Sequence, residues 1–346
     1  MTTPLTVQLK AEAARLGFDL CGIAPARAVA DGDYFQGWLA DGHAGDMAPW
    51  LAKNSACRAD PKSLLAAAQS VIVLGLNYYQ PSPARRGKIS TYALGRDYHD
   101  IIPPKLDALD HWLRQHGGTQ RRAVDTSALM EKPLAISAGL GWLGKSTVLV
   151  HPRFGPWLFL AELLTSLTLT PDTPAGSHCG TCARCLNACP TGALSAPYRL
   201  DARRCIAYLT IEHQGGIPLT LRKKIGDNLF GCDYCLNACP WGRRSQATRE
   251  AALAVTPCPD LREMLYWDDA EFRRMFRGTP IFRLKRRRWL RNISVVLGNI
   301  GADADLPALR HAAADADPLV AEHAAWAIEQ ISTLDIKTKI ATMPPH

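Results

Sequence analysis

The spacing of the cysteines constrains this 346-residue chain more than any other feature. Cys179, Cys182 and Cys185 are followed by Cys189 and Pro190, which is the C-x2-C-x2-C-x3-C-P run of bacterial two-cluster ferredoxins. Three thiolates in a tight loop can reach three irons of one cubane, and the fourth then points toward a second cluster. The sequence therefore predicts two [4Fe–4S] clusters.

A second cysteine run is incomplete. Cys232, Cys235 and Cys239-Pro240 repeat the end of the first run, but Leu229 stands where its first cysteine would be. Cys205 is the only cysteine between the runs, so we expect it to supply the missing thiolate. The predicted ligands are Cys179, Cys182, Cys185 and Cys239 for one cluster, and Cys189, Cys205, Cys232 and Cys235 for the other.

Structural zinc is the alternative occupant of these cysteines. Zinc sites use C-x2-C pairs with long separations, or Cys together with His, and two runs that end in C-x3-C-P fit that pattern poorly. The chain has eleven cysteines, and its first residues, 1–18, are typical of an amphipathic helix and not of a signal peptide. These features favour a reducing cytoplasm, where clustered thiols bind metal. Cys21, Cys57 and Cys258 are expected to be packing residues.

The composition changes twice along the chain, which predicts an α+β protein of three domains. Residues 1–165 carry apolar strand patterns such as Val71–Leu76, with helices between them such as Pro104–His116. Residues 166–255 are rich in Cys, Gly and Pro and form the ferredoxin-like segment. Residues 256–346 are helical, and Leu290–Ile300 resembles Ala321–Ile331 in apolar spacing. This repeat indicates either a short stack of HEAT-type helices or an ordinary helical hairpin.

One glycine-rich loop imitates a nucleotide-binding motif. Gly139–Ser146 satisfies both G-x-G-x-x-G and G-x4-G-K-S. Both motifs need a strand before the loop and a helix after it. Here a helix is expected before the loop, over Leu129–Ala138, and a strand after it, so we predict no nucleoside triphosphate site. Contact of this glycine-rich backbone with some other flat cofactor is the alternative.

A basic segment, Phe272–Arg291, carries nine Lys or Arg residues and no acidic residue. Such runs are usually a solvated face. Because nine like charges are costly without counter-charges, we favour nucleic acid as the partner, with an acidic protein surface as the competing one. The residues expected to contact phosphates are Arg283, Lys285, Arg286, Arg287, Arg288 and Arg291.

Eight further motifs are spread over nearly the whole chain: Gly17–Ile23, Arg58–Lys62, Gly95–His99, Val124–Thr126, Glu131–Ala135, Ala138–Lys145, Cys205–Glu212 and Gly231–Cys235. In these motifs the chain resembles the epoxyqueuosine reductases, a family of cobalamin-dependent iron–sulfur enzymes of tRNA modification. One departure is Gly242, where many relatives carry Asn.

This resemblance implies reduction of the epoxide of epoxyqueuosine to queuosine at the wobble position of tRNA. Electrons from an external donor would pass through the two clusters to a base-off cobalamin held by the N-terminal domain. Asp125 would be the acid that protonates the departing oxygen. The positions carried over as cobalamin contacts are Arg58, Ser90, Asp125, Leu149 and Leu160. Nothing demands an oligomer, so a monomer is expected.

Other interpretations exist for two single residues and for the function of the whole chain. Asp125 could instead cap a helix that begins near Ala128, and His99 is expected to be a structural or surface residue and not a cobalt ligand. The whole chain could instead be a corrinoid enzyme similar to reductive dehalogenases, or an electron carrier with partner-binding domains. The carrier would leave the N-terminal domain without a task.

Overall fold

The computed structural model describes residues 4–341, and the side chains of residues 4–333. The chain forms two compact units whose segments alternate along the sequence. Residues 1–81, 95–202 and 233–254 make the first unit, and residues 82–94, 203–232 and 255–346 make the second. The second unit takes residues 82–94 because β3 (Lys88–Ile89) pairs in parallel with β10 (Asn228–Phe230). The three domains divided at residues 165 and 255 remain a prediction about segments of sequence.

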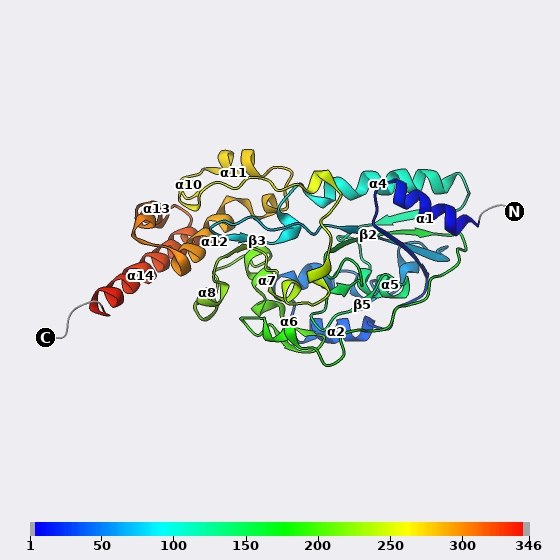
Figure 1. The fold of residues 1–346 in the computed structure, drawn as a ribbon, viewed down its shortest axis with the longest axis horizontal. Coiled ribbons are helices and arrows are strands. Elements are labelled where there is room, and N and C mark those ends of the chain that lie inside the picture. Colours follow the sequence, from blue (N-terminus) through cyan, green and yellow to red (C-terminus); the bar gives the residue numbers. More distant parts are fainter. Residues whose placement is uncertain (1–3, 342–346) are drawn as a thin grey trace. The chain divides into compact units, whose positions relative to one another are not determined.

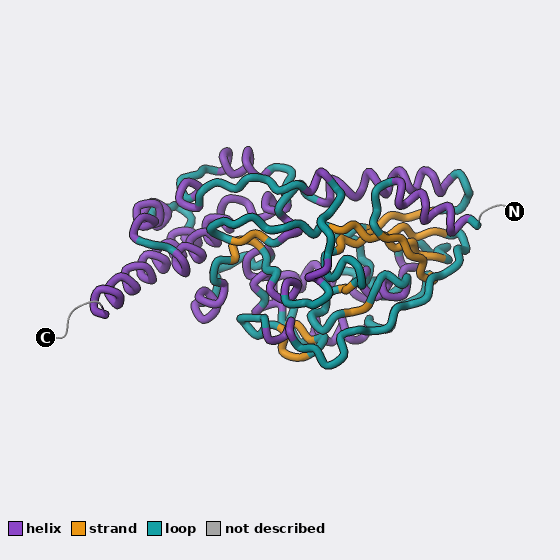
Figure 2. Tube along the Cα trace, viewed as in Figure 1, coloured by secondary structure: helices purple, strands orange, loops and turns teal. Residues whose placement is uncertain are grey.

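The first unit is built on a four-stranded antiparallel sheet in the order β1-β2-β7-β4 (Figure 2). Its strands are β1 (Leu20–Pro25), β2 (Ser70–Asn77), β4 (Gln120–Ala123) and β7 (Leu158–Thr165). Every residue of β2 is buried, which confirms the strand predicted from its apolar run. Such a continuous apolar run is what a strand covered on both faces requires.

Helices flank this sheet and position the loops that follow it. Those predicted from sequence are α1 (Leu5–Arg15), α4 (Tyr98–Arg114) and α5 (Glu131–Ser137). Helix α5 ends before the glycine-rich loop Gly139–Ser146 begins. The short strand β5 (Trp142–Leu143) lies within this loop and β6 (Leu149–Val150) follows it, which confirms the predicted order of a helix before the loop and a strand after it. The remaining elements are α2 (Gly32–Ala40), α3 (Ala48–Ala52), α6 (Arg184–Asn187), β8 (Leu194–Ala196), β9 (Arg199–Leu200) and α9 (Tyr234–Asn237).

The second unit is mostly helical. Its C-terminal helices are α12 (Lys285–Ile300), α13 (Leu306–Ala313) and α14 (Pro318–Ala341), and both α12 and α13 pack against α14 (Figure 1). The close approach depends on Gly298, because a Cβ there would lie 2.4 Å from the ring of Trp326. The shorter helices are α7 (Ile206–Ile211), α8 (Leu219–Ile225), α10 (Leu261–Met264) and α11 (Asp269–Phe276). In the described part of the chain, no helix is long and apolar enough to cross a membrane.

Candidate functional site

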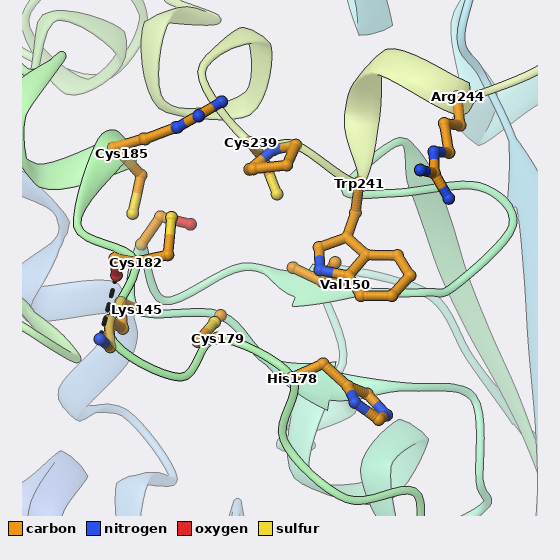
Figure 3. Close-up of a pocket in the computed structure, with 13 residues that line it drawn as sticks. Lys145, Val150, His178, Cys179, Cys182, Cys185, Cys239, Trp241 and Arg244 are labelled. Carbon is orange, nitrogen blue, oxygen red and sulfur yellow. Dashed lines mark hydrogen bonds between the residues drawn. The ribbon is translucent and has the colours of Figure 1, made fainter.

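Four of the predicted cluster ligands surround one cavity in the first unit. Cys179, Cys182, Cys185 and Cys239 line a space of about 360 Å³ (Figure 3). All eleven cysteines are free thiols. Within residues 4–341, no three Cys, His, Asp or Glu side chains converge closely enough to hold a single metal ion. The four thiols surround a space instead, and this donor set suits a cubane whose irons each take one thiolate.

The two cysteine runs fold alike, as their shared spacing suggested. Each places a short helix before its last cysteine, α6 in the first run and α9 in the second. The backbone N–H of Cys189 donates to the carbonyl of Leu186, and that of Cys239 donates to the carbonyl of Leu236. The repeated turn explains why the C-x3-C-P ending recurs in both runs.

The glycine-rich loop braces the first cysteine run. The Nζ of Lys145 donates to the carbonyl oxygens of Gly180, at 2.6 Å, and Cys182, at 3.0 Å. Figure 3 shows this lysine reaching the cysteine loop from below the cavity. The motif that imitates a phosphate-binding loop therefore has a role in shaping the cysteine loop.

The other four cysteines lie in both units. Cys189 follows α6 and Cys235 lies on α9 in the first unit, whereas Cys205 precedes α7 and Cys232 follows β10 in the second. Their common cluster remains a prediction from the spacing. Of the three remaining cysteines, Cys57 is exposed, so the prediction that it packs in a core is wrong.

Asp125 lies in the loop after β4, in a left-handed backbone conformation with φ of 46°. Its Oδ2 accepts a hydrogen bond of 2.8 Å from the hydroxyl of Tyr98 and lies 3.3 Å from Nε2 of His99. The alternative that Asp125 caps a helix is wrong, because α5 begins at Glu131 with Met130 as its N-cap residue. The Asp125 side chain is 44% exposed, so a substrate can reach its carboxyl group.

His99 holds a proton next to this carboxylate. Its Nδ1 lies 2.9 Å from Oδ1 of Asp97, which also caps the start of α4. The neighbouring carboxylates of Asp125 and Asp97 raise the pKa of His99 to about 9 and outweigh the opposite effect of burial. The imidazole is therefore protonated at neutral pH. The sequence indicated a structural or surface histidine, whereas the fold brings it beside Asp125.

Two carboxyl groups behind Asp125 were not found from the sequence. An oxygen of Glu131 accepts the backbone N–H of Asp125 at 2.6 Å, and burial followed by the charge of Asp125 raises the pKa of Glu131 to about 7. Glu162 lies in the middle of β7, opposite Ala123, with no exposed surface. Burial, then the neighbouring Glu131, raises its pKa well above the ordinary value.

Neither carboxyl oxygen of Glu162 has a hydrogen-bond partner of ordinary geometry in the part of the chain that is described. The sequence held one signal for this residue, since Glu162 interrupts an otherwise apolar run, Leu158–Leu164. A charged residue inside a buried strand is uncommon unless it is paired or has a functional role.

The side chains carried over as cobalamin contacts suit a large, partly apolar ligand. Arg58 is buried, its Nη1 donates to the carbonyl of Ser127, and its Nε has no partner among residues 4–333. Leu149 is buried on β6 and Leu160 is partly buried on β7, while Ser90 is a buried residue of the second unit. A free N–H of a buried guanidinium fits the amide groups that surround a corrin ring.

The basic segment of the second unit has more counter-charges than its own sequence shows. Arg283 pairs with Glu212 at 3.1 Å and Arg287 with Asp317 at 2.8 Å. Arg286 pairs with Asp315. The argument that these charges lack counter-ions is thereby corrected, because the acidic partners come from other segments of the chain.

Arg291 is corrected most clearly. Its side chain has no exposed surface and donates to the carbonyl oxygens of Leu209, His213 and Gly215. Arg288 also donates to carbonyl groups, including that of Ile211 at 2.6 Å. The charge of Arg291 is used inside the protein, so this residue does not reach a phosphate group.

The cysteine region defines the class of protein. Residues 178–242 match the family described as "4Fe-4S double cluster binding domain". The chain is therefore a double-cluster iron–sulfur protein, and the zinc alternative is rejected. Residues 58–126, which include Asp125, match the family described as "Epoxyqueuosine reductase QueG, DUF1730".

Whole-chain comparisons identify the family. The chain is 41% identical to an epoxyqueuosine reductase of Xanthomonas campestris, over 95% of this chain and 96% of the relative, and 38% identical to that of Escherichia coli, over 94% and 89%. A crystal structure of an epoxyqueuosine reductase with a modified tRNA-Tyr stem loop matches 99% of this chain and 95% of its own, with a TM-score of 0.88 and 30% identity. A Bacillus subtilis structure whose catalytic loop is swung out of the active site matches with a TM-score of 0.87, 29% identity and coverage of 99% and 95%. This chain belongs to the epoxyqueuosine reductase family.

Proposed function

We propose that this protein reduces epoxyqueuosine in tRNA to queuosine in the cytoplasm, as a monomer supplied by an external electron donor. Family membership supports the reaction, and the relative bound to an epoxyqueuosine-modified stem loop supports the substrate. The observation that carries the proposal is the exposed Asp125 carboxylate with a proton-bearing His99 at 3.3 Å.

The reaction consumes two electrons and two protons for each epoxide that becomes an alkene, and it releases one water. His99 passes its proton to the Asp125 carboxylate, Asp125 transfers it to the departing epoxide oxygen, and solvent supplies the second proton. Tyr98 orients the carboxylate through its hydroxyl. Cobalamin, when bound, would supply the reducing power for cleavage of the carbon–oxygen bond. Arg58, Ser90, Leu149 and Leu160 would hold it, together with Asp125.

The clusters carry electrons to this site. We assign Cys179, Cys182, Cys185 and Cys239 to one cluster on the basis of their common cavity. Cys189, Cys205, Cys232 and Cys235 are assigned to the other from the sequence spacing alone.

The helical second unit is proposed to hold tRNA. Arg283, Lys285 and Arg287 are the exposed members of the basic segment, and Arg286 and Arg288 are partly buried beside them. Their role is to contact phosphates and position the anticodon loop, not to read bases. We propose that α12, α13 and α14 are the HEAT-type repeat that presents them.

Electron paramagnetic resonance tests the cofactors of this proposal. Anaerobically purified protein is mixed with cob(II)alamin, and the spectrum is compared with that of free cobalamin. A base-off cobalt signal, together with cluster signals on reduction, is expected. Cluster signals beside an unchanged cobalamin spectrum would reject the corrinoid enzyme and leave an iron–sulfur RNA-binding or electron-carrier protein.

A further inference from the structure

The surroundings of the first cluster cavity carry an unusual charge pattern. The stretches 173–200 and 234–249, which supply all four cysteines of the cavity, contain no Asp or Glu. They contain five arginines, and the cavity wall adds Lys145. No acidic residue lines the cavity. The Arg, Lys, Asp and Glu side chains around this cavity therefore carry a net positive charge.

Four of the five arginines pair with no carboxylate among the described side chains, and three of these four lie in the cysteine runs or directly after them. Arg184, Arg243 and Arg244 are exposed, and none of them pairs with a carboxylate in the described part of the chain. Arg184 and Arg244 line the same cavity as the cysteines, and Figure 3 shows Arg244 beside Trp241. The arginines of the basic segment in the second unit differ, since three of them are matched by Glu212, Asp315 and Asp317.

Two aromatic residues, His178 and Trp241, line the same cavity. The rings of His178 and Trp241 lie 5.8 Å apart, and Trp142 packs against both, at 4.8 Å and 5.1 Å. His178 is exposed and Trp241 is partly buried. Weak electron-transfer encounters bury less than about 1,200 Å², so a small aromatic surface beside exposed arginines is large enough for one. Long-range charge attraction then raises the rate of association more than the affinity.

We propose that Arg184, Arg243 and Arg244 form the docking surface for a small acidic electron-transfer protein, which reduces the cluster held by Cys179, Cys182, Cys185 and Cys239. This inference names the donor class for the proposed function and rests on it. In each encounter the donor loses one electron and the cluster gains one. Two encounters therefore supply the two electrons that each epoxide consumes. RNA is the competing polyanion, but RNA is not an electron donor and could not reduce the cluster in this cavity.

Stopped-flow absorbance tests this surface on the holoenzyme. The probe is reduced flavodoxin, an acidic flavoprotein, and photoreduced deazaflavin is the small reductant without a docking surface. For each protein we divide the rate of cluster reduction by flavodoxin by the rate with deazaflavin. This ratio is compared between the wild type, the single variants Arg184→Glu, Arg243→Glu and Arg244→Glu, and the triple variant that combines them. At low salt the ratio is expected to fall at least about tenfold in the triple variant, and the wild-type rate with flavodoxin should fall as salt rises. Arg27→Glu, an exposed arginine outside the cavity, is the matched control.

A ratio unchanged by charge reversal overturns the proposal, and so does a loss of tRNA affinity with the ratio unchanged, which would assign this surface to RNA. If the triple variant loses its clusters, the ratio is measured in the single variant Arg243→Glu. Arg243 does not line the cavity, so its replacement should leave the cluster in place. Cluster reduction is observed without epoxyqueuosine. If the charge reversals lower the ratio but the wild-type enzyme does not reduce epoxyqueuosine when deazaflavin is the reductant, the docking surface stands. Only the proposed function is then rejected.

Discussion

The Nε2 atom of His99 lies 3.3 Å from Oδ2 of Asp125, so an imidazolium stands beside the carboxylate at the end of β4. Tyr98, the preceding residue of α4, donates its hydroxyl to the same oxygen. One helix N-terminus thus presents both a proton and an orienting hydrogen bond to the carboxylate. The first prediction follows from this arrangement.

Replacing His99 with Gln should lower the rate of epoxide reduction about a hundredfold at pH 7, since the proton source for Asp125 is lost. The wild-type rate should fall as pH rises through about 9, where His99 loses its proton, and the variant should lack this step. Single-turnover rates between pH 6 and 10 measure both. Tyr98→Phe is the control, because its ring still stacks on Phe159 and the step near pH 9 should persist. A step that also persists in His99→Gln would contradict the role of His99.

The same pKa shift affects stability. A histidine whose folded-state pKa is raised from 6.5 to about 9 stabilises the fold fully below about pH 6.5. This contribution should be lost as the pH rises through 9. The melting temperature of the wild type should therefore fall relative to His99→Gln across this range, and parallel curves would contradict the ion pair.

Glu162→Gln should stabilise the protein at pH 8. A buried carboxyl group whose pKa is raised favours the fold only below about pH 4.5 and opposes it as ionisation is forced at higher pH. The gain should be about 1 kcal/mol or more at pH 8 and should nearly vanish at pH 5. Chemical unfolding at both pH values measures it. Glu12→Gln, which changes an exposed ion pair with Arg15, should show no such gain. An equal effect of Glu162→Gln at both pH values would contradict a buried, protonated carboxyl group.

Gly298→Ala should destabilise the helical unit by about 1–3 kcal/mol, because the new methyl group would overlap the ring of Trp326. This loss should exceed the ordinary benefit of alanine in a helix, which is about 1 kcal/mol. Gly37→Ala, in α2 with nothing within 4 Å of the added Cβ, should be neutral or stabilising. Denaturant midpoints of the two variants decide, and similar values would contradict the tight α12–α14 contact.

Two arginines of the basic segment should separate structure from RNA binding. Arg291→Met should destabilise the fold by at least about 2 kcal/mol, since it leaves buried carbonyl groups without donors. Arg287→Ala should leave the melting temperature nearly unchanged but lower the salt dependence of tRNA binding by about one phosphate contact. If Arg291→Met were stable and bound tRNA weakly, the structural role of Arg291 would be wrong.

The sequence predicted those parts of the molecule that depend on local spacing. The cysteine runs, the apolar run Val71–Leu76 of strand β2 and the order of helix and strand around Gly139–Ser146 could be found because each rests on neighbouring residues. Helix α4 begins at Tyr98, six residues before the predicted start at Pro104, because two prolines inside it imitated a helix boundary.

The environment of Asp125 could not be found in the same way. His99 comes from α4, Glu131 from α5 and Glu162 from β7, so their meeting depends on sheet register and helix placement. The pairing of the basic segment could not be predicted for the same reason, since its acidic partners lie between 29 and 71 positions away in the sequence or are replaced by backbone carbonyls. Long-range contacts of this kind leave no periodic signal in a single sequence.

Nucleoside mass spectrometry of the reacted tRNA tests the central claim most directly. An epoxyqueuosine-modified stem loop is incubated anaerobically with the cluster- and cobalamin-loaded protein and a chemical reductant, beside an Asp125→Asn variant with equal cluster content. We predict that the wild type converts epoxyqueuosine to queuosine with loss of one oxygen and that the variant converts at least a hundredfold less. Unchanged epoxyqueuosine with the loaded wild-type protein would contradict the proposed function, and equal conversion by the variant would contradict the role of Asp125.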